Sequence, residues 1–328
     1  MSKQYNLAVC GATGVVGRKI IQVLEERDFP IENLSLFASA RSAGQTIDFK
    51  GEAITIQELK EDSLKAPIDI AIFSAGGETS THYAPFAADN GVIVIDNSSA
   101  WRMDPKVPLV VPEVNSNALA NGSKIIANPN CSTIQSVVPL AALKPYGIKR
   151  VVYSTYQAVS GAGQKGLADL ENNTTNNFPY PINDTVIPQI DVFLDNGYTK
   201  EEIKMIEETR KILEMPELRV TATTVRVPIK NSHGVSINIE LEKEFDLDTV
   251  REDFAKYPGI VVVDDNANLK YPLQSEATGK DEVFVGRIRR DESLENGINI
   301  YVVADNIRKG AATNSVQIAE ALVKNNLV

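Results

Sequence analysis

Cysteine is scarce in this sequence, with only Cys10 and Cys131 among 328 residues. Two cysteines are too few for a disulfide framework. Long apolar runs are missing too: a run such as residues 92–95 has the size of a strand, far below the roughly 20 residues that a membrane helix needs. The first residues lead directly into a strand-like run, without the basic region and apolar stretch of a secretory signal. We therefore expect a cytoplasmic protein with no membrane partner.

Positive charge is in deficit as well, since 33 Lys and Arg face 43 Asp and Glu and the formal net charge is −10. Proteins that bind nucleic acids need a positive surface field, so we expect neither DNA nor RNA as a partner. The hydrophobic content of 43% and the charged content of 23% are typical of a folded globular protein. An anionic ligand would have to be bound by a few locally placed cations.

The length exceeds the usual size of one hydrophobic core and predicts two domains. Strand-like runs alternate with helical segments in the first part of the chain, which is typical of a parallel, doubly wound sheet. These predicted strands are residues 5–10, 34–38, 68–74 and 92–96. We predict an α/β protein with a Rossmann-type dinucleotide-binding domain over residues 1–130.

The pattern changes after Cys131. Helical patterns cover residues 132–143 and 200–213, and Thr199 with Glu202 is a capping-box signature for the second helix. Strand-like runs are residues 150–159, 219–227, 235–241, 260–263, 283–287 and 298–303. We predict an α+β substrate domain with a mixed sheet over residues 131–305. A C-terminal helix over residues 306–328 is expected to pack back on the first domain.

Gly11, Gly14 and Gly17 follow the first predicted strand and open the first predicted helix. A bound pyrophosphate needs a tight turn, a close backbone approach and the free N–H groups of a helix N-terminus. The spacing is GxxGxxG rather than the standard GxGxxG, so a purely structural glycine turn stays an alternative. The predicted cofactor-binding residues of this region are Gly11, Thr13, Gly14, Val15 and Val16, with Gly76 after the third predicted strand as a further contact or a simple turn.

The end of the second predicted strand bears on the choice of cofactor. A protein that binds NAD usually has Asp or Glu there to bind the ribose 2′-hydroxyl, and this sequence has none. Arg41, together with Ser39 and Ser42, suits a 2′-phosphate instead and favours NADP. The alternative is that Arg41 is a solvated loop charge.

Cys131 lies in the segment NPNCST, directly after an apolar strand and at the start of a predicted helix. A helix N-terminus lowers the pKa of a thiol and can hold a developing oxyanion. A lone cysteine is usually a small core residue, and we interpret Cys10 in that way. The polar neighbours of Cys131 argue against such burial, and we predict that it is a nucleophile.

The sequence has two histidines, His82 and His233. His233 is expected in a turn at residues 231–234, where an imidazole can exchange protons near neutral pH. A surface-turn histidine is the alternative, although Arg226 could point toward the same cleft. His82 is expected to be a packing or surface residue, and no metal site is predicted.

Taken together, these segments resemble the aspartate-β-semialdehyde dehydrogenases, of the glyceraldehyde-3-phosphate-dehydrogenase-like superfamily, along essentially the whole chain. The resemblance rests on GATGVVG from Gly11, NPNCST around Cys131, YQAVSGAG from Tyr156, and residues 226–233. It implies the reversible, NADPH-dependent reductive dephosphorylation of 4-phospho-L-aspartate to L-aspartate 4-semialdehyde and inorganic phosphate, through a thioester on Cys131. It also implies a place in lysine, threonine, methionine and diaminopimelate biosynthesis, and a homodimer or homotetramer whose contacts lie in the second domain.

The resemblance implies roles for single residues. His233 would move the proton and Gln157 would orient the substrate. Arg226 would bind the substrate carboxylate, Glu201 its amino group, and Arg102 with Lys204 its phosphate. The remaining cofactor contacts would be Ser160, Gly161 and Asn306. A guanidinium fork does suit carboxylate and phosphate groups. Glu201 and Lys204, three apart on one predicted helix, could instead be an exposed ion pair.

Three other functions share part of this sequence pattern. N-acetyl-γ-glutamyl-phosphate reductases share the reactive cysteine but typically have Gly before it, where this sequence has Asn130. A phosphorylating glyceraldehyde-3-phosphate dehydrogenase is disfavoured because the cysteine context differs and the NAD-type acid is missing. A nonenzymatic NADP-binding sensor could use the same nucleotide domain and would need no nucleophile.

Overall fold

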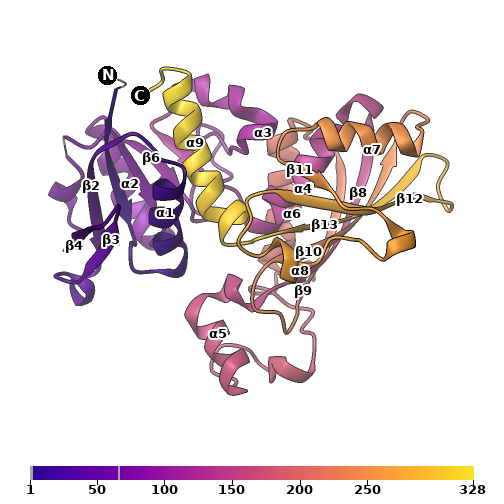
Figure 1. Ribbon diagram of the computed structural model, residues 1–328, viewed down its shortest axis with the longest axis horizontal. Coiled ribbons are helices and arrows are strands. Elements are labelled where there is room, and N and C mark those ends of the chain that lie inside the picture. Colours follow the sequence, from indigo (N-terminus) through magenta and orange to yellow (C-terminus); the bar gives the residue numbers. More distant parts are fainter. Residues whose placement is uncertain (1–2, 66) are drawn as a thin grey trace. The chain divides into compact units, whose positions relative to one another are not determined.

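The computed structural model describes residues 3–65 and 67–328, which form two compact units (Figure 1). The first unit is made of the chain up to Pro129 together with Ala311–Val328, and the second is Asn130–Gly310. In the described part of the chain, no helix is both long and apolar enough to cross a membrane.

The first unit is built on a seven-stranded sheet in the order β3-β4-β2-β1-β5-β6-β7. All neighbouring strands are parallel except β3 and β4, which pair antiparallel as a hairpin, so the predicted Rossmann-type arrangement is confirmed. The strands are β1 Tyr5–Cys10, β2 Ile31–Ala38, β3 Thr46–Phe49, β4 Glu52–Glu58, β5 Ile70–Phe73, β6 Ile93–Asp96 and β7 Ile125–Ala127. The helices are α1 Val15–Glu26, α2 Gly77–Asp89, α3 Pro112–Asn115 and α9 Thr313–Lys324.

Alternate residues of β1 enter two different cores, as the period of a strand requires. Leu7 and Val9 pack in a cluster with residues of α1 and α9, whereas Ala8 and Cys10 pack in a second cluster with residues of α2. A strand buried on both faces needs a continuous apolar run, which β1 supplies. Cys10 is fully buried, and its interpretation as a core residue is confirmed.

The last helix is shorter than predicted. Asp305 accepts backbone hydrogen bonds from Ile307 (2.8 Å) and Arg308 (3.0 Å), which fold the chain into a turn at that point. A π-helical segment, Arg308–Ala312, comes next, and α9 begins only at Thr313. α9 belongs to the first unit, where it packs on α1.

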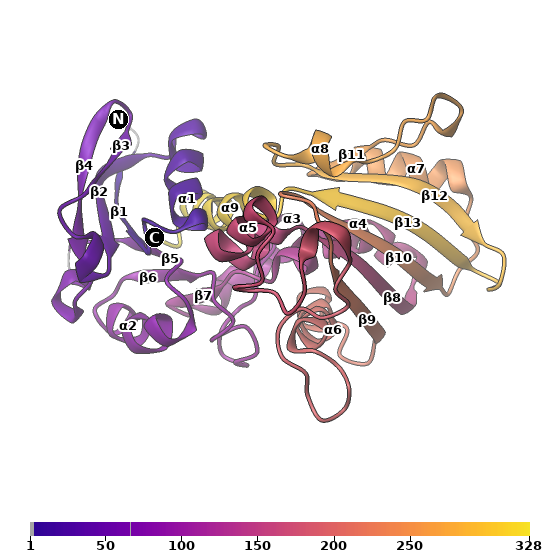
Figure 2. The same ribbon diagram turned by 90° about the horizontal axis from the view of Figure 1, so that it is seen from below.

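The second unit is built on a six-stranded mixed sheet in the order β11-β12-β13-β10-β8-β9, with the strands side by side in Figure 2. The pairs β8–β9 and β11–β12 are parallel and the others are antiparallel, which confirms the predicted mixed sheet. The strands are β8 Ile148–Gln157, β9 Arg219–Arg226, β10 His233–Leu241, β11 Ile260–Val262, β12 Val283–Asp291 and β13 Gly297–Ala304. The helices are α4 Cys131–Leu143, α5 Gly163–Asn172, α6 Lys200–Leu213, α7 Leu247–Lys256 and α8 Gln274–Ala277.

Helix α4 is the centre of the second core, because it contacts strands β8, β10, β12 and β13 as well as α6 and α7. The side chain of Asn130 caps α4 by accepting hydrogen bonds from the N–H groups of Ser132 (2.9 Å) and Thr133 (3.2 Å). The predicted capping box of α6 is confirmed: Thr199 and Glu202 exchange side-chain to backbone hydrogen bonds.

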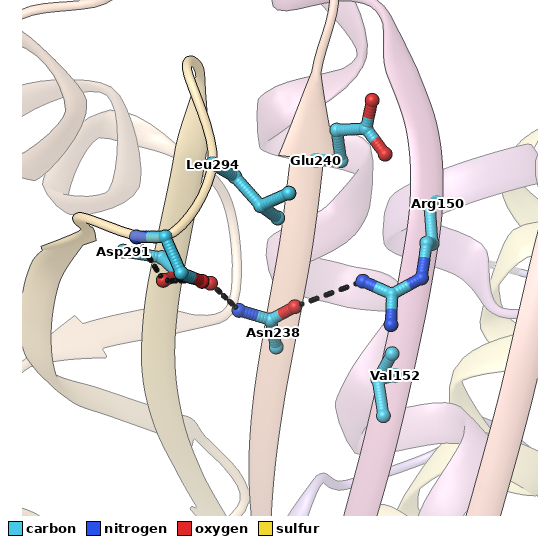
Figure 3. Close-up of a pocket in the computed structure, with 7 residues that line it drawn as sticks. Arg150, Val152, Asn238, Glu240, Asp291 and Leu294 are labelled. Carbon is cyan, nitrogen blue, oxygen red and sulfur yellow. Dashed lines mark hydrogen bonds between the residues drawn. The ribbon is translucent and has the colours of Figure 1, made fainter.

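The more exposed face of the second sheet carries a row of polar side chains. Arg150 donates to Asn238 (3.2 Å), which donates in turn to Asp291 (2.6 Å), and Figure 3 shows Asn238 between the two charged residues. These side chains line a cavity of about 500 Å³ on β8, β10 and β12.

The predicted turn at residues 231–234 is wrong in its second half. His233 and Gly234 already belong to β10, because they pair with Ala304 and Val303 of β13. His233 is fully buried, so the alternative of a surface-turn histidine does not hold. His82 was expected to be a packing or surface residue. It is a surface residue, exposed on α2 beside Glu61.

Candidate active site

Cys131 is the first residue of α4 and is partly exposed. Its Sγ lies 3.2 Å from Nε2 of His233, the first residue of β10. A Cβ atom placed on Gly310 would lie 2.8 Å from the Cβ of Cys131, so only glycine allows the backbone to pass this close to the cysteine. The sulfur therefore has a defined position next to an imidazole.

The ring of His233 is oriented by the protein backbone. The N–H of Ala158 donates to Nδ1 of His233 at 3.0 Å, so Nδ1 is an acceptor and a neutral ring carries its proton on Nε2, facing the sulfur. Burial lowers the pKa of His233 well below its usual value of 6.5, and the charge of Arg226 lowers it further. The imidazole is therefore a neutral hydrogen-bond donor toward Cys131 at neutral pH.

Glu201 joins two neighbours of the nucleophile. Its Oε1 accepts hydrogen bonds from the side-chain amides of Asn130 (2.8 Å) and Gln157 (3.1 Å). Its Oε2 lies 3.3 Å from Nζ of Lys204, which is also 2.7 Å from Asp191. Because Glu201 is only 5% exposed, the alternative of an exposed ion pair with Lys204 does not hold for the carboxylate. The buried carboxylate could accept hydrogen bonds from an ammonium group.

Arg226 ends β9 and is buried. Its Nη1 donates to the carbonyl of Ala158 at 2.6 Å, while its buried Nε has no hydrogen-bond partner among the described residues. Burial lowers the pKa of Arg226, and the charges of Glu201 and Cys131 raise it. A Cβ on Gly161 would lie 3.0 Å from Nη1, so the glycine leaves room beside the guanidinium. An unpartnered guanidinium N–H is suited to bind a carboxylate.

Ser160 and Asn306, two of the predicted cofactor contacts, are buried and hold each other. Nδ2 of Asn306 donates to Ser160 Oγ at 3.0 Å, and Oδ1 of Asn306 accepts from the N–H of Ser232 at 2.8 Å. The structure thus brings Ser160, Gly161 and Asn306 to the same corner as His233.

The first unit contains a cavity of about 560 Å³ at the carboxyl ends of β1 and β2. Its lining comprises Gly11, Thr13, Gly14, Ala38, Ser39, Ala40, Glu58, Leu59, Ser74, Ala75, Thr79 and Tyr83. Ligands of doubly wound sheets bind at this edge. Of the predicted cofactor residues, Val15, Val16, Arg41, Ser42 and Gly76 fall outside the lining given by the described residues and remain predictions.

The glycine turn fits a pyrophosphate. Gly11 has a φ of +87°, and a Cβ on it would lie 2.4 Å from the carbonyl oxygen of Ser74. A Cβ on Gly17 would lie 2.1 Å from the carbonyl oxygen of Gly11, so this glycine is needed for helix–strand packing. Gly14 caps α1 without a side-chain hydrogen bond, which leaves the N–H groups of a twelve-residue helix for an anion.

A carboxylate that the sequence reasoning missed lies in the same cavity. Glu58 ends β4, opposite Ala38 of β2, and forms an ion pair with Lys60 at 3.0 Å. Arg41 is exposed, whereas Ser42 is buried. Both a cation and a carboxylate are therefore available near the end of β2.

Arg102, predicted to bind phosphate, belongs to the first unit and is buried. Its Nε donates to the carbonyl of Asn128 (3.0 Å) and its Nη2 to the carbonyl of Asn97 (2.9 Å). These bonds hold the guanidinium against the chain three residues before Cys131 in the sequence.

Comparison with known proteins places the whole chain. Residues 6–122 match the family described as semialdehyde dehydrogenase, NAD binding domain, and residues 137–309 match semialdehyde dehydrogenase, dimerisation domain. The chain is 55% identical to the aspartate-semialdehyde dehydrogenase of Aquifex aeolicus over 99% of both chains, and 47% identical to that of Bacillus subtilis over 100% of both. The chain belongs to the aspartate-semialdehyde dehydrogenase family.

Solved structures agree with this assignment. Aspartate semialdehyde dehydrogenase II from Vibrio cholerae has a TM-score of 0.94 and 46% identity, covering 98% of this chain and 99% of that one. The same Vibrio protein has also been solved in complex with ASA. As a member of the aspartate-semialdehyde dehydrogenase family, the chain is an oxidoreductase of amino-acid biosynthesis with a nicotinamide-dinucleotide-binding domain, and its dimerisation domain supports a homodimer.

Three residues near Cys131 have roles in the structure that were not predicted from the sequence. Asn130 caps α4 and binds Glu201, and Glu208 accepts the N–H of Asn130 at 2.7 Å. Gly310 allows the close approach described above. The preference of helix N-caps for Asn could have identified Asn130, whereas nothing in the pattern of α6 distinguishes Glu208 from a surface glutamate.

Proposed function

We propose that this protein catalyses the reversible, NADPH-dependent reductive dephosphorylation of 4-phospho-L-aspartate to L-aspartate 4-semialdehyde and inorganic phosphate. The observation that carries the proposal is the 3.2 Å contact between Cys131 Sγ and His233 Nε2 at the N-terminus of α4. The Vibrio relative solved with ASA supports the substrate class. The enzyme would serve lysine, threonine, methionine and diaminopimelate biosynthesis in the cytoplasm, as a homodimer or homotetramer.

In the proposed reaction the sulfur of Cys131 attacks the carbonyl carbon of the acyl phosphate. Cys131 reacts as its thiolate, whose proton has already passed to solvent. The bond from this carbon to the phosphate oxygen breaks, its electron pair leaves with the phosphate, which takes up a proton from solvent, and a thioester remains on Cys131. Asn130 already accepts the N–H groups of Ser132 and Thr133, so the donor best placed for the developing oxyanion is Nε2–H of His233.

The second half of the reaction reduces the thioester. NADPH, when bound, would supply the hydride for the thioester carbon. His233 Nε2–H stabilises the oxygen of the tetrahedral intermediate, and when the C–S bond breaks the electron pair returns to Cys131. Because the ring is held neutral, we propose that it works mainly as a hydrogen-bond donor, and that the proton it was expected to move stays on Nε2 for most of the cycle.

Arg226 would bind the α-carboxylate of the substrate, Glu201 its ammonium group, and Gln157 would orient it through Glu201. Arg102 and Lys204 would bind the phosphate. Pairing of a buried guanidinium with a carboxylate also fixes the orientation of the substrate, because the pair can be bidentate.

NADP is the proposed cofactor. The turn from Gly11 to Val16 would bind the pyrophosphate, with Gly76 beside it, and Ser160, Gly161 and Asn306 would lie at the nicotinamide. Arg41 with Ser39 and Ser42 would bind the 2′-phosphate. The cavity lining supports this proposal through Gly11, Thr13, Gly14 and Ser39.

The test is phosphate-dependent reduction of NADP⁺, measured by absorbance with L-aspartate 4-semialdehyde and with N-acetyl-L-glutamate 5-semialdehyde. Turnover of the first compound, abolished in Cys131→Ala, is the expected result. His233→Ala should retain some activity, because loss of one hydrogen-bond donor to the oxyanion commonly lowers the rate by about 10² to 10³. Preference for the N-acetylated compound would instead favour the reductase alternative, and wild-type activity after alkylation of Cys131 by iodoacetamide would contradict any thioester.

A further inference from the structure

Arg226 is held by a segment that the chain forms between β8 and α6. This segment, residues 163–199, is called the excursion. The excursion starts with α5, and Figure 1 shows it projecting beside β9. Ile187 pairs with the backbone of Arg226 in both directions, at 2.9 Å and 2.8 Å, so the excursion adds a short edge to the sheet where β9 ends. The backbone of Arg226 is thereby fixed from a segment that the catalytic scheme does not use.

Phe178 fixes the other end of the same residue. Its ring lies 5.9 Å from the Cζ of Arg226, within the range of a cation–π contact. The ring is buried in a small cluster with Val159, Ile182 and Ile187. A Cβ on Gly166 of α5 would lie 3.2 Å from Cζ of the ring, so α5 packs against the edge of Phe178.

Asp169 holds Phe178 in place. Its side chain, which is 0% exposed, accepts hydrogen bonds from Thr174 Oγ1 (2.6 Å) and from the N–H groups of Asn176 (3.0 Å), Asn177 (2.7 Å) and Phe178 (3.0 Å). Burial raises the pKa of Asp169, but these four donors outweigh it and lower the pKa to about 2. The carboxylate is therefore ionised at neutral pH and fully used in shaping the loop at residues 174–178.

The loop at residues 174–178 is ordered around one inward-facing side chain. Its residues around Phe178 are exposed, and only the phenylalanine turns inward, toward Arg226. Meanwhile the Nε of Arg226 has no hydrogen-bond partner among the described residues, and its Nη1 donates to the carbonyl of Ala158. A guanidinium with so few bonds needs packing to keep one orientation.

We propose that Asp169 and Phe178 are positioning residues that act through Arg226 and set the affinity for the carboxylate end of the substrate. The inference rests on the proposed role of Arg226 as the carboxylate ligand. Asp169 orders the loop, the loop places the ring of Phe178, and the ring keeps the guanidinium aimed into the site. Loss of a desolvated cation–π contact corresponds to about a tenfold change in an equilibrium constant.

The experiment compares Phe178→Leu and Asp169→Asn with two matched controls from the same excursion, Phe193→Leu and Asp184→Asn. Phe193 and Asp184 are exposed, and neither has been given a role in the site. We expect both test variants to raise KM for L-aspartate 4-semialdehyde about tenfold, with kcat within about twofold and the KM values for phosphate and NADP⁺ unchanged. The controls should leave all four constants unchanged.

A double-mutant cycle decides whether Phe178 acts through Arg226. Arg226→Lys alone should raise KM for the semialdehyde, and adding Phe178→Leu should raise it no further. Additive effects on KM would overturn the inference while leaving the proposed function intact. A fall in kcat that is the same at saturating semialdehyde and at saturating phosphate would do so as well. Since both candidate semialdehydes carry a carboxylate, the same cycle is run on whichever one the wild-type enzyme turns over. The inference is thus tested even where the proposed substrate is wrong, and thermal melting identifies any variant that fails to fold.

Discussion

The backbone N–H of Ala158 donates a hydrogen bond to Nδ1 of His233 at 3.0 Å, on the side of the ring opposite Cys131. An imidazolium would have to place a second N–H against this donor, with the cation of Arg226 nearby. Both contacts disfavour protonation. A single backbone group thus sets the tautomer, and with it the direction in which the ring can donate.

This arrangement predicts how stability depends on pH. Since the pKa of folded His233 is lowered, the unfolded chain binds a proton below the usual value of 6.5 while the folded protein does not. The stability that this residue contributes is fully present above pH 6.5 and is lost as the pH falls toward the lowered pKa. The free energy of unfolding falls by up to about 1.4 kcal/mol per pH unit in that range. His233→Asn should flatten that part of the curve, as measured by urea unfolding at a series of pH values.

His82→Asn is the control for this measurement, because His82 is exposed on α2. Its pH curve should follow that of the wild type. If His233→Asn also kept the wild-type slope between pH 6.5 and 5, the histidine would not be buried in its neutral form.

Asn130 combines two functions that substitutions can separate. Its side-chain oxygen caps α4 and its side-chain nitrogen binds Glu201. Asn130→Ala should cost about 1 kcal/mol of stability through the cap and should also raise KM for the semialdehyde. Asn130→Ser keeps a capping oxygen, so it should recover most of the stability and none of the affinity. Equal recovery of both in the serine variant would show that the contact to Glu201 is unimportant.

The fold was predictable where periodicity is strong. Residues 5–10 and 200–213 were predicted with the bounds that the structure has, because an apolar run and a capping box mark their ends. The hairpin of β3 and β4 was missed because each strand has only two large apolar residues, Ile47 and Phe49 in β3 and Ile54 and Ile56 in β4, so the alternation is too brief to stand out. Helix α5 was missed because it contains two glycines, which lower helix propensity.

The chemistry of the site followed from sequence more readily than its geometry. NPNCST identified Cys131 at a helix N-terminus, since helix caps are local features. The tautomer of His233 depends on a backbone N–H from 75 residues away, and the order of the loop around Phe178 depends on packing against α5. Such long-range contacts leave no periodic signal in the sequence.

Gly310 gives a direct test of how closely the nucleophile is held. A methyl group there would lie 2.8 Å from Cβ of Cys131, so Gly310→Ala must displace the start of α4 or the π-helical segment. We expect a loss of about 1–3 kcal/mol of stability, as for other overpacked sites, together with at least a tenfold lower kcat. The control is Gly77→Ala, because a Cβ on Gly77 meets nothing within 4 Å and should change the melting temperature little. Wild-type turnover in Gly310→Ala would show that the position of the sulfur is not critical.

The choice between NADPH and NADH should depend on two opposite charges near the end of β2. Arg41→Ala removes the proposed ligand of the 2′-phosphate and should raise KM for NADPH about tenfold, since a charge-assisted hydrogen bond is worth about 1.5–3 kcal/mol, while leaving NADH unaffected.

Glu58→Gln removes a carboxylate from the same cavity and frees Lys60, with which it pairs at 3.0 Å. This variant should therefore bind NADPH more tightly and NADH more weakly, because a ribose 2′-hydroxyl exchanges a charged acceptor for a neutral one and a 2′-phosphate loses a repulsive neighbour. The KM values for NADPH and NADH, measured at low ionic strength to limit screening, check both predictions. If both KM values changed in the same direction in Glu58→Gln, the carboxylate would shape the cavity without discriminating between the cofactors.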